Sequence, residues 1–103
     1  MGKRQITGPE KVMIHRKRQD ISIAEAADRV GCSRSYLWKV ESGDHKPSPD
    51  LAVKIANLLG LDTDELLGDF GHVAPDIAAF LVSNPDAAKR VRSMIKPSLE
   101  AQK

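Results

Sequence analysis

The chain has 103 residues, 41% of them hydrophobic, and a formal net charge of +2. This length suits one small domain with a modest core, and no stretch approaches the roughly 18 apolar residues that a membrane span needs. Because no apolar leader follows the N-terminal methionine, we expect a cytoplasmic protein without a membrane segment.

The first predicted helix lies in a basic part of the chain. Proline favours the first helical position, so a helix should begin near Pro9 and run to about Gln19. Residues 1–20 carry six cations against two anions, whereas residues 40–70 carry two cations against seven. Phosphates should therefore prefer the side that bears the N-terminal residues, although such charge runs can also be plain solvated surface.

Two short helices joined by a tight turn are predicted next. Ser22 and Glu25 have the spacing of a capping box, so a helix should start at Ile23. Gly31 is the residue type expected where a chain leaves a helix in the left-handed conformation, and Ser33 can cap the following helix. So short a connection predicts a helix-turn-helix.

The second of these helices has two contrasting faces when its residues are placed helically around an axis. Tyr36, Leu37 and Val40 fall on one side, which should be core. The other side contains no acid and consists of Arg34, Ser35, Trp38, Lys39 and Ser42. Arginine and lysine can bind guanine edges, and serine and tryptophan can contact other bases or sugars, so this face suits DNA. The alternative is an ordinary solvated helix with a chance tryptophan.

Two further helices should complete a domain. Ser48 and Pro49 open a fourth helix that Gly60 ends, and Asp62 caps a short fifth that ends at Gly68. No segment alternates with period two for long enough to form a strand. The predicted class is all-α.

From about Pro9 to Leu67 these signals join into one longer pattern. It reads Ser22-x-x-Glu25-x-Ala27-x-x-Val30-Gly31-x-Ser33-x-Ser35-Tyr36-Leu37-x-x-Val40-Glu41-x-Gly43, then Pro47-Ser48, then Ala56-x-x-Leu59-Gly60-Leu61-x-x-Asp64-Glu65-Leu66-Leu67. This pattern resembles the Cro and phage-repressor helix-turn-helix family, also called XRE-like. The resemblance implies a five-helix, lambda-repressor-like domain whose third helix recognises DNA.

By position, the resemblance also implies functional residues. The base-reading candidates are Arg34, Ser35, Trp38 and Lys39. The phosphate-contacting candidates are Ser33, Ser42, His45 and Lys46, to which the basic end of the first helix adds Lys17 and Arg18.

The resemblance further implies that Arg16 and Glu41 form a charged pair that fixes the third helix against the first. The alternative is two unrelated surface charges. The chain departs from the family pattern at Ile23, where a glutamine usually reaches a phosphate, and at Asp20, where a glycine is usual. A phosphate contact near Ile23 would then depend on backbone N–H groups at the helix start.

The last third lies beyond the resemblance. After a connector at residues 70–74, helices are expected over about 75–83 and 85–96, where Pro97 should interrupt the pattern. This helical hairpin carries apolar stripes made of Ile77, Phe80 and Leu81 on the first helix and Val91, Met94 and Ile95 on the second. The stripes could pack on their own domain, on a second copy or on another protein.

Enzymatic function finds little support in the residues. His15, His45 and His72 do not have metal-ligand spacings, and no cofactor or metal is implied. Cys32 has no cysteine partner and stands at a small apolar position, which favours a reduced, half-buried thiol over a redox sensor.

The sequence therefore predicts a non-enzymatic, homodimeric transcriptional regulator, a repressor or autoregulator, that binds a palindromic double-stranded DNA operator. Three segments are expected: a basic arm at 1–8, a helix-turn-helix domain at 9–68 and a helical extension at 69–103 for dimerisation or partner binding. The alternative is an antitoxin-like or anti-factor protein-interaction module whose tail binds a partner protein. A non-DNA adaptor that keeps only the fold fits less well with the acid-free face.

Overall fold

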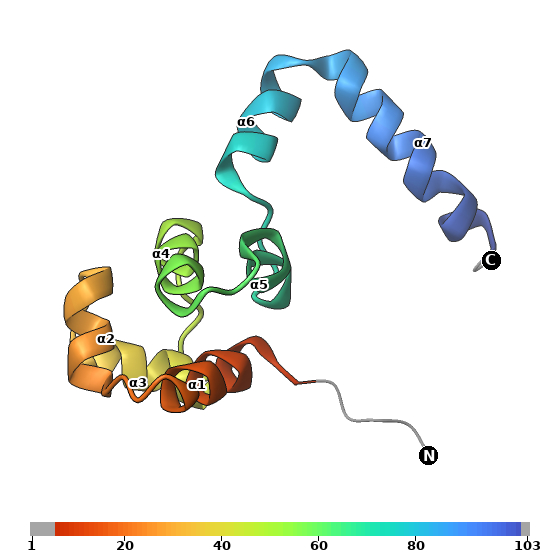
Figure 1. Cartoon of the computed structure of the whole chain (residues 1–103). Coiled ribbons are helices and arrows are strands. Elements are labelled where there is room, and N and C mark those ends of the chain that lie inside the picture. The colour runs from red at the N-terminus through yellow and green to blue at the C-terminus, as the bar shows by residue number, and fades with distance from the viewer. Residues whose placement is uncertain (1–5, 102–103) are drawn as a thin grey trace.

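The computed structural model describes the backbone of residues 6–101 and the side chains up to Ile95, and all its regular elements are helices (Figure 1). The expected basic arm lies mostly outside this range, because residues 1–5 are not among those described. The helices are α1 (Gly8–Arg18), α2 (Ile23–Val30), α3 (Arg34–Ser42), α4 (Pro49–Leu59), α5 (Thr63–Asp69), α6 (Pro75–Ser83) and α7 (Pro85–Ala101). The prediction of an all-α fold is confirmed.

The first five helices each begin at a side chain that accepts a hydrogen bond from the backbone three residues on. The caps are Thr7, Ser22, Ser33, Ser48 and Asp62, with distances between 2.8 and 3.3 Å. Each bond satisfies one N–H that the helix itself leaves without a carbonyl partner. Local chemistry alone therefore sets where these helices start.

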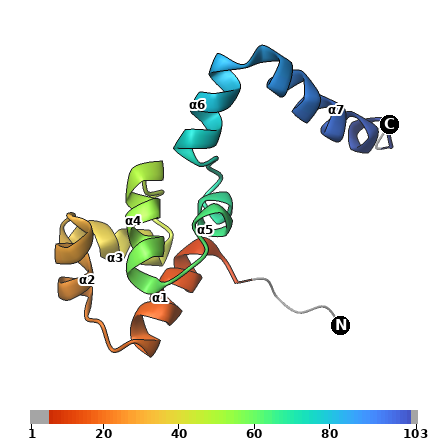
Figure 2. The same ribbon diagram turned by 45° about the horizontal axis from the view of Figure 1, so that its top comes forward.

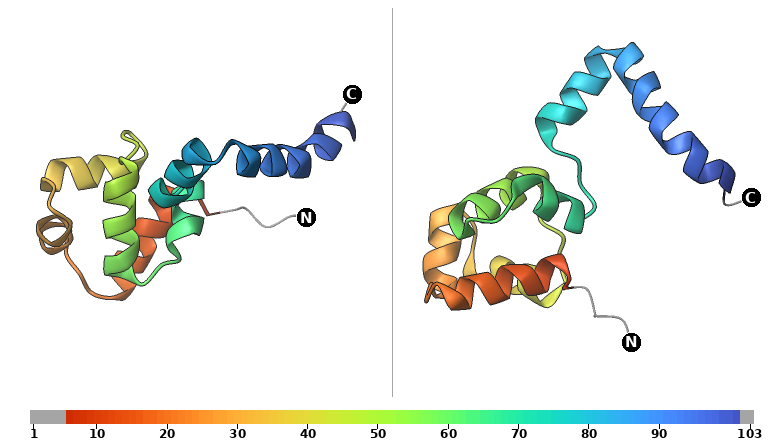
Figure 3. Two further views of the ribbon diagram at one scale, coloured as in Figure 1. Left: turned by 90° about the horizontal axis from the view of Figure 1, so that it is seen from above. Right: turned by 45° about the vertical axis from the view of Figure 1, so that its right-hand side comes forward.

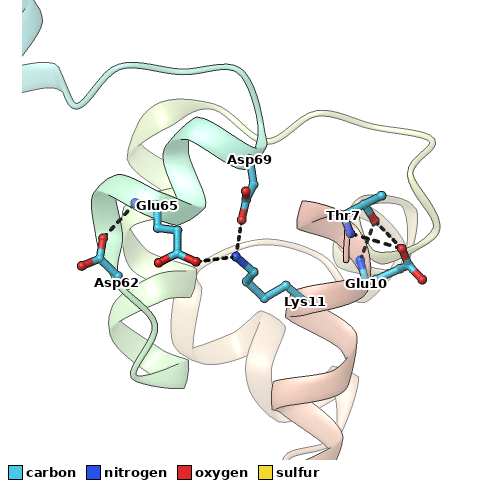
Figure 4. A network of polar contacts seen from close by, with 6 residues as sticks. All are labelled: Thr7, Glu10, Lys11, Asp62, Glu65 and Asp69. Carbon is cyan, nitrogen blue, oxygen red and sulfur yellow. Dashed lines mark hydrogen bonds and ion pairs between the residues drawn. The ribbon is translucent and has the colours of Figure 1, made fainter. Parts of the chain in front are cut away.

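The complete capping box lies at a place the sequence analysis did not expect. At the start of α1 the Glu10 carboxylate accepts the Thr7 N–H at 3.2 Å, in return for the Thr7 cap (Figure 4). At Ser22 only the serine half forms, because the Glu25 carboxylate pairs with Arg29 at 2.9 Å. A carboxylate in the first turn of a helix can thus accept the N–H of the capping residue, as Glu10 does, or pair with a nearby cation, as Glu25 does.

The turn between α2 and α3 requires a left-handed residue. Gly31 has φ 80°, and its N–H and that of Cys32 both donate to the carbonyl of Ala27, at 2.9 and 3.0 Å. Glycine adopts this conformation without the steric cost that a Cβ would bring. The two helices therefore meet at the angle that the short turn imposes (Figure 2).

The core lies among α1 to α5. α1 packs on α3 and α4, α2 packs on α3 and α4, and α4 packs on α5 (Figures 1 and 3). The largest fully buried apolar side chains are those of Val12, Leu37, Val40, Ile55, Leu66 and Leu67. Leu37 and Val40 were predicted to be core, whereas Tyr36 is half-buried at its edge.

The connector after α5 is docked on this core. Phe70 is 8% exposed and lies against Gly8, where an added Cβ would come within 3.1 Å of the ring. His72 Nε2 lies 2.7 Å from the carbonyl oxygen of Pro47, and Ala74 is buried. The core therefore continues past the expected domain boundary at Gly68, and we call residues 8–74 the helix-turn-helix domain.

The tail, α6 and α7, stands clear of that domain. The views in Figures 1, 2 and 3 agree that the two helices form an open V that extends away from α1 to α4. No residue of α6 is buried, and Phe80 is 57% and Ile95 48% exposed. Of the three predicted locations for the apolar stripes, packing on the chain's own domain is not seen.

The expected interruption at Pro97 is wrong, because the backbone of α7 continues to Ala101. A proline inside a helix removes one backbone hydrogen bond and clashes with one carbonyl. A helix can absorb that loss by a kink instead of ending.

Candidate DNA-binding surface

The outer face of α3 forms one continuous surface with the start of α2. Arg34, Ser35, Trp38 and Lys39 are all exposed, and Trp38 keeps 56% of its surface accessible. Together with Ser22, Ile23 and Ala24 they line an open hollow of about 620 Å³. The structure thus brings all four base-reading candidates together beside the first turn of α2.

This hollow is positively charged and partly apolar. Its charged lining side chains are Arg34 and Lys39, and no carboxylate is among those that line it. Ile23, which stands where the family pattern has a glutamine, and Trp38 supply apolar surface. The N–H groups of Ile23 and Ala24 belong to a first helical turn, where no carbonyl of the same helix can accept them. The surface therefore offers cations, backbone donors and apolar area to one ligand.

Two of the phosphate candidates adjoin this surface. Lys17, at the end of α1, lines a second hollow of about 290 Å³ with Ile23, Trp38 and Ser42. The Ser42 hydroxyl donates to the carbonyl of Lys39 at 3.1 Å, so its oxygen lone pairs remain but its proton is engaged. Arg18 is exposed on the same last turn of α1 but does not line either hollow.

The remaining phosphate candidates have other local roles. The Ser33 oxygen caps α3 by accepting the Tyr36 N–H at 3.0 Å, which leaves its proton free to donate. The His45 ring stacks on Tyr36, with ring centres 5.6 Å apart and planes 11° apart. The Lys46 amino group lies beside Gly71, about 3.4 Å from where a Cβ would stand. His45 and Lys46 therefore lie in the α3–α4 loop, where His45 contacts α3 and Lys46 contacts the connector, and neither lines the hollow.

A buried ion pair holds α3 against α1. Arg16 Nε and Nη2 donate to the two carboxylate oxygens of Glu41 at 2.6 and 2.9 Å, and Nη1 donates to the carbonyl of Ile21 at 2.8 Å. The two side chains are only 9% and 5% exposed. A two-pronged arginine–carboxylate pair fixes orientation as well as distance. The outer face of α3 is thereby set relative to α1 and to the loop before α2.

Lys11 corrects the expected distribution of charge. From the sequence, Lys11 was expected to belong to the basic N-terminal side, but its amino group bridges Glu65 at 3.1 Å and Asp69 at 2.5 Å on α5 (Figure 4). The hydrogen bond that Lys11 donates to Asp69 is the main reason that the pKa of Lys11 is raised above its usual value, against the opposing effect of burial. Lys11 therefore joins α1 to α5 and does not contribute to the surface beside Trp38.

Cys32 is half-buried at the α2–α3 turn, and burial raises the pKa of its thiol. A raised pKa keeps the sulfur protonated and weakly nucleophilic. Within residues 6–95, no cluster of three or more histidine, cysteine or acidic side chains could hold a metal ion. No helix in the described part of the chain is long and apolar enough to cross a membrane.

The capped helices, the left-handed turn at Gly31 and the acid-free outer face of α3 define a helix-turn-helix protein. The chain belongs to the HTH_3 helix-turn-helix family, whose model matches residues 12–66, more than half of the chain. It is similar to RstR, the cryptic phage CTXphi transcriptional repressor of Vibrio cholerae, with 37% identity over 59 residues, or 57% of this chain. The match covers 53% of RstR, so the chain spans about half the length of this curated relative.

Solved structures share the fold. SinR, the master regulator for biofilm formation, in complex with DNA, is 26% identical with a TM-score of 0.54, covering 59% of this chain and 98% of that one. The SinR–SinI protein complex covers 95% of this chain and 98% of that one with the same TM-score of 0.54. At 20% identity this second likeness shows the fold alone.

From the sequence, the start of α2 was expected to contribute only a backbone phosphate contact near Ile23, and its side chains were not predicted to line the surface. Ser22 was predicted only as a cap, Ile23 as a departure from the family pattern, and Ala24 not at all. The available signal was the short turn itself, because so tight a connection forces the start of one helix close to the face of the next.

Proposed function

We propose that this protein is a sequence-specific DNA-binding transcriptional repressor that acts in the cytoplasm, with α3 in the major groove. The observation that carries the proposal is the acid-free outer face of α3, which lines a cationic hollow with α2. The similarity to RstR, a transcriptional repressor, and to a SinR structure in complex with DNA supports it. As expected for this family, the protein works by binding and not by catalysis.

Each side chain has a proposed role. Arg34 and Lys39 bind guanine edges, Ser35 adapts as donor or acceptor, and Trp38 covers a sugar or a thymine methyl. The phosphate contacts come from Lys17, Arg18, Ser33 and Ser42, with His45 and Lys46 at the edge of the surface. The α2 N-terminus, with its unpaired N–H groups, binds a further phosphate in place of the missing glutamine side chain.

The protein acts as a homodimer on a palindromic operator. One α3 can read only a half-site, and two-fold dimers of this class read half-sites about 34 Å apart. The exposed apolar stripes of the tail, with Ile77 44% and Phe80 57% exposed, supply a surface that a second copy can cover. We therefore propose three segments: a basic arm at 1–7, a DNA-binding domain at 8–74 and a dimerisation tail after it, with the domain boundaries moved from Pro9 to Gly8 and from Gly68 to Ala74.

Selection of bound fragments from a random duplex library tests the proposal. We expect a palindrome with two half-sites about 34 Å apart. Arg34→Ala should cost about 1–3 kcal/mol on the selected site and relax preference at one base pair per half-site. The matched variant Lys17→Ala should weaken binding to all DNA sequences alike. It should also reduce the slope of the logarithm of the binding constant against the logarithm of salt concentration by about one unit. Absence of any enriched sequence would contradict the proposal.

A second candidate function is a protein-interaction module whose tail binds another protein. The exposed stripe favours it as much as it favours self-association, because apolar surface alone does not name its partner. Sedimentation of the purified chain separates the two. A protein that stays monomeric at micromolar concentration and binds selected DNA weakly would favour the partner-binding function.

A further inference from the structure

A third hollow lies on the side of the domain where the tail begins. It is formed by the first two turns of α4 and the first turns of α5 and α6, and it has a volume of about 610 Å³. Val53, Ala74 and Pro75 provide its apolar surface. We call this hollow the tail-base groove.

The charges around the tail-base groove are mostly negative. Asp50, Asp64 and Asp76 line it, one from the first turn of each helix, against the single cation Lys54. The hollow of about 620 Å³ between α3 and the start of α2 has the opposite character, because cations and no carboxylate line it. An apolar segment flanked by cations would therefore be attracted to the tail-base groove and repelled from the DNA-binding surface.

The tail helix α7 is such a segment. With residues about 100° apart, Val91, Met94 and Ile95 share one face of α7, and all three are exposed. On the same projection Arg90 and Arg92 fall on the two opposite edges of this face. The helix thus carries an apolar stripe with a cation along each side.

We propose that α7 of a second copy of this chain docks in the tail-base groove, with Arg90 and Arg92 facing the carboxylates at its rim. A second copy is required for this docking because, within one chain, α6 leads α7 away from the tail-base groove (Figures 1 and 3). Two-fold symmetry then gives two equal docking sites, since each tail occupies the groove of the other copy. The inference rests on the proposed homodimer and specifies which surfaces form it.

Exchange of tails has a consequence for DNA binding. The groove includes Ala74, and the connector before it is held to the domain by Phe70 and by His72 at Pro47. A tail docked on the partner's domain would therefore tie the two domains together directly. If the two tails contacted only each other, the relative position of the two domains would depend on the exposed α6 helices.

Charge reversal tests the assignment. In the groove variant, Asp50→Lys with Asp64→Lys, and in the tail variant, Arg90→Glu with Arg92→Glu, like charges would face one another at both sites. Each variant alone should dimerise about tenfold or more weakly than the natural chain in sedimentation equilibrium. Mixed in equal amounts, they should form a heterodimer, because one site then regains opposite charges in reversed order and the other is unchanged.

Three outcomes are decisive. A groove variant that dimerises like the natural chain would overturn the inference and leave the homodimer in place, with its contact between the tails. Failure of the mixture to dimerise, although circular dichroism shows both variants folded, would also overturn it. A natural chain that is itself monomeric would contradict the proposed dimer. If the lysines disturb the helix starts, Asp50→Asn with Asp64→Asn supplies a milder version, with a smaller but measurable weakening.

Discussion

The helix-turn-helix domain and the tail are built from helices with the same kind of amphipathic pattern, yet the two regions treat their apolar faces differently. In the domain, Leu37, Ile55 and Leu66 are each about 1% exposed. In the tail, Phe80 is 57% and Met94 77% exposed. A periodic apolar face shows that a helix needs a partner surface, but not whether its own chain provides one.

The difference has a geometrical origin. The connections between α2 and α3 and between α4 and α5 are short, and each begins with a left-handed glycine, so neighbouring helices must fold back on one another. The connector before α6 also contains a left-handed glycine, Gly71, but it is longer, and Phe70 and His72 hold it against the domain. Pro75 then starts α6 in a direction that leads away from the core (Figure 3).

Removal of the tail should have the largest effect. A chain ending at Ala74 keeps every buried residue of the described structure, so it should fold. It should be monomeric, and its affinity for the operator should fall by a factor of about 10²–10⁴, because binding to one half-site no longer brings a linked second domain to the other half-site. Sedimentation and gel-shift titration measure both, with circular dichroism as the folding control. A truncated chain that still dimerises would place the interface within the domain.

Loss of the buried ion pair should have the next largest effect. Glu41→Ala would leave the Arg16 guanidinium, which is 9% exposed, without its carboxylate and should destabilise the domain by about 3–5 kcal/mol in urea unfolding. The double variant Arg16→Met with Glu41→Leu should lower the free energy of unfolding by much less than the sum of the two single changes, because no buried charge is then left without a partner. Additive losses would mean that the pair does not act as a unit.

The Lys11 bridge should contribute less, since Glu65 is 67% exposed. Lys11→Met should destabilise by less than about 1 kcal/mol, and Lys11→Arg should restore most of the loss. Because pairing raises the pKa of Lys11, its contribution is present below the ordinary value of 10.5 and is lost as pH rises through the raised value. The stability difference between the natural chain and Lys11→Met should therefore vanish at strongly alkaline pH.

The smallest effect is optical. Trp38 is the single tryptophan and is 56% exposed, so the free protein should show the long-wavelength emission of a hydrated indole. Addition of selected DNA should change its intensity or wavelength, whereas random DNA should change it less. A blue-shifted emission that iodide does not quench in the free protein would place Trp38 in a core and contradict the assigned face of α3.

The sequence by itself determined the features that depend on neighbours along the chain. Serine caps at positions 22, 33 and 48 and glycines at 31 and 60 set the helix ends, because these bonds and dihedral angles span only a few residues. The inner and outer faces of α3 followed from helical geometry in the same way. The two-pronged pair of Arg16 and Glu41 needed more than local rules, and the resemblance to a known family indicated it.

Only the tertiary structure decided what depends on residues far apart in the sequence. Lys11 was counted with the basic N-terminal side until the fold placed α5 beside α1 and gave it two carboxylates. Phe70 and Ala74 belong to the core because Gly8 and the α3–α4 loop lie where the connector passes. Ile23 became part of the candidate DNA-binding surface because the fold set α2 beside Trp38. A sequence states each side chain's chemistry, but the partners that chemistry meets are set by how the helices pack.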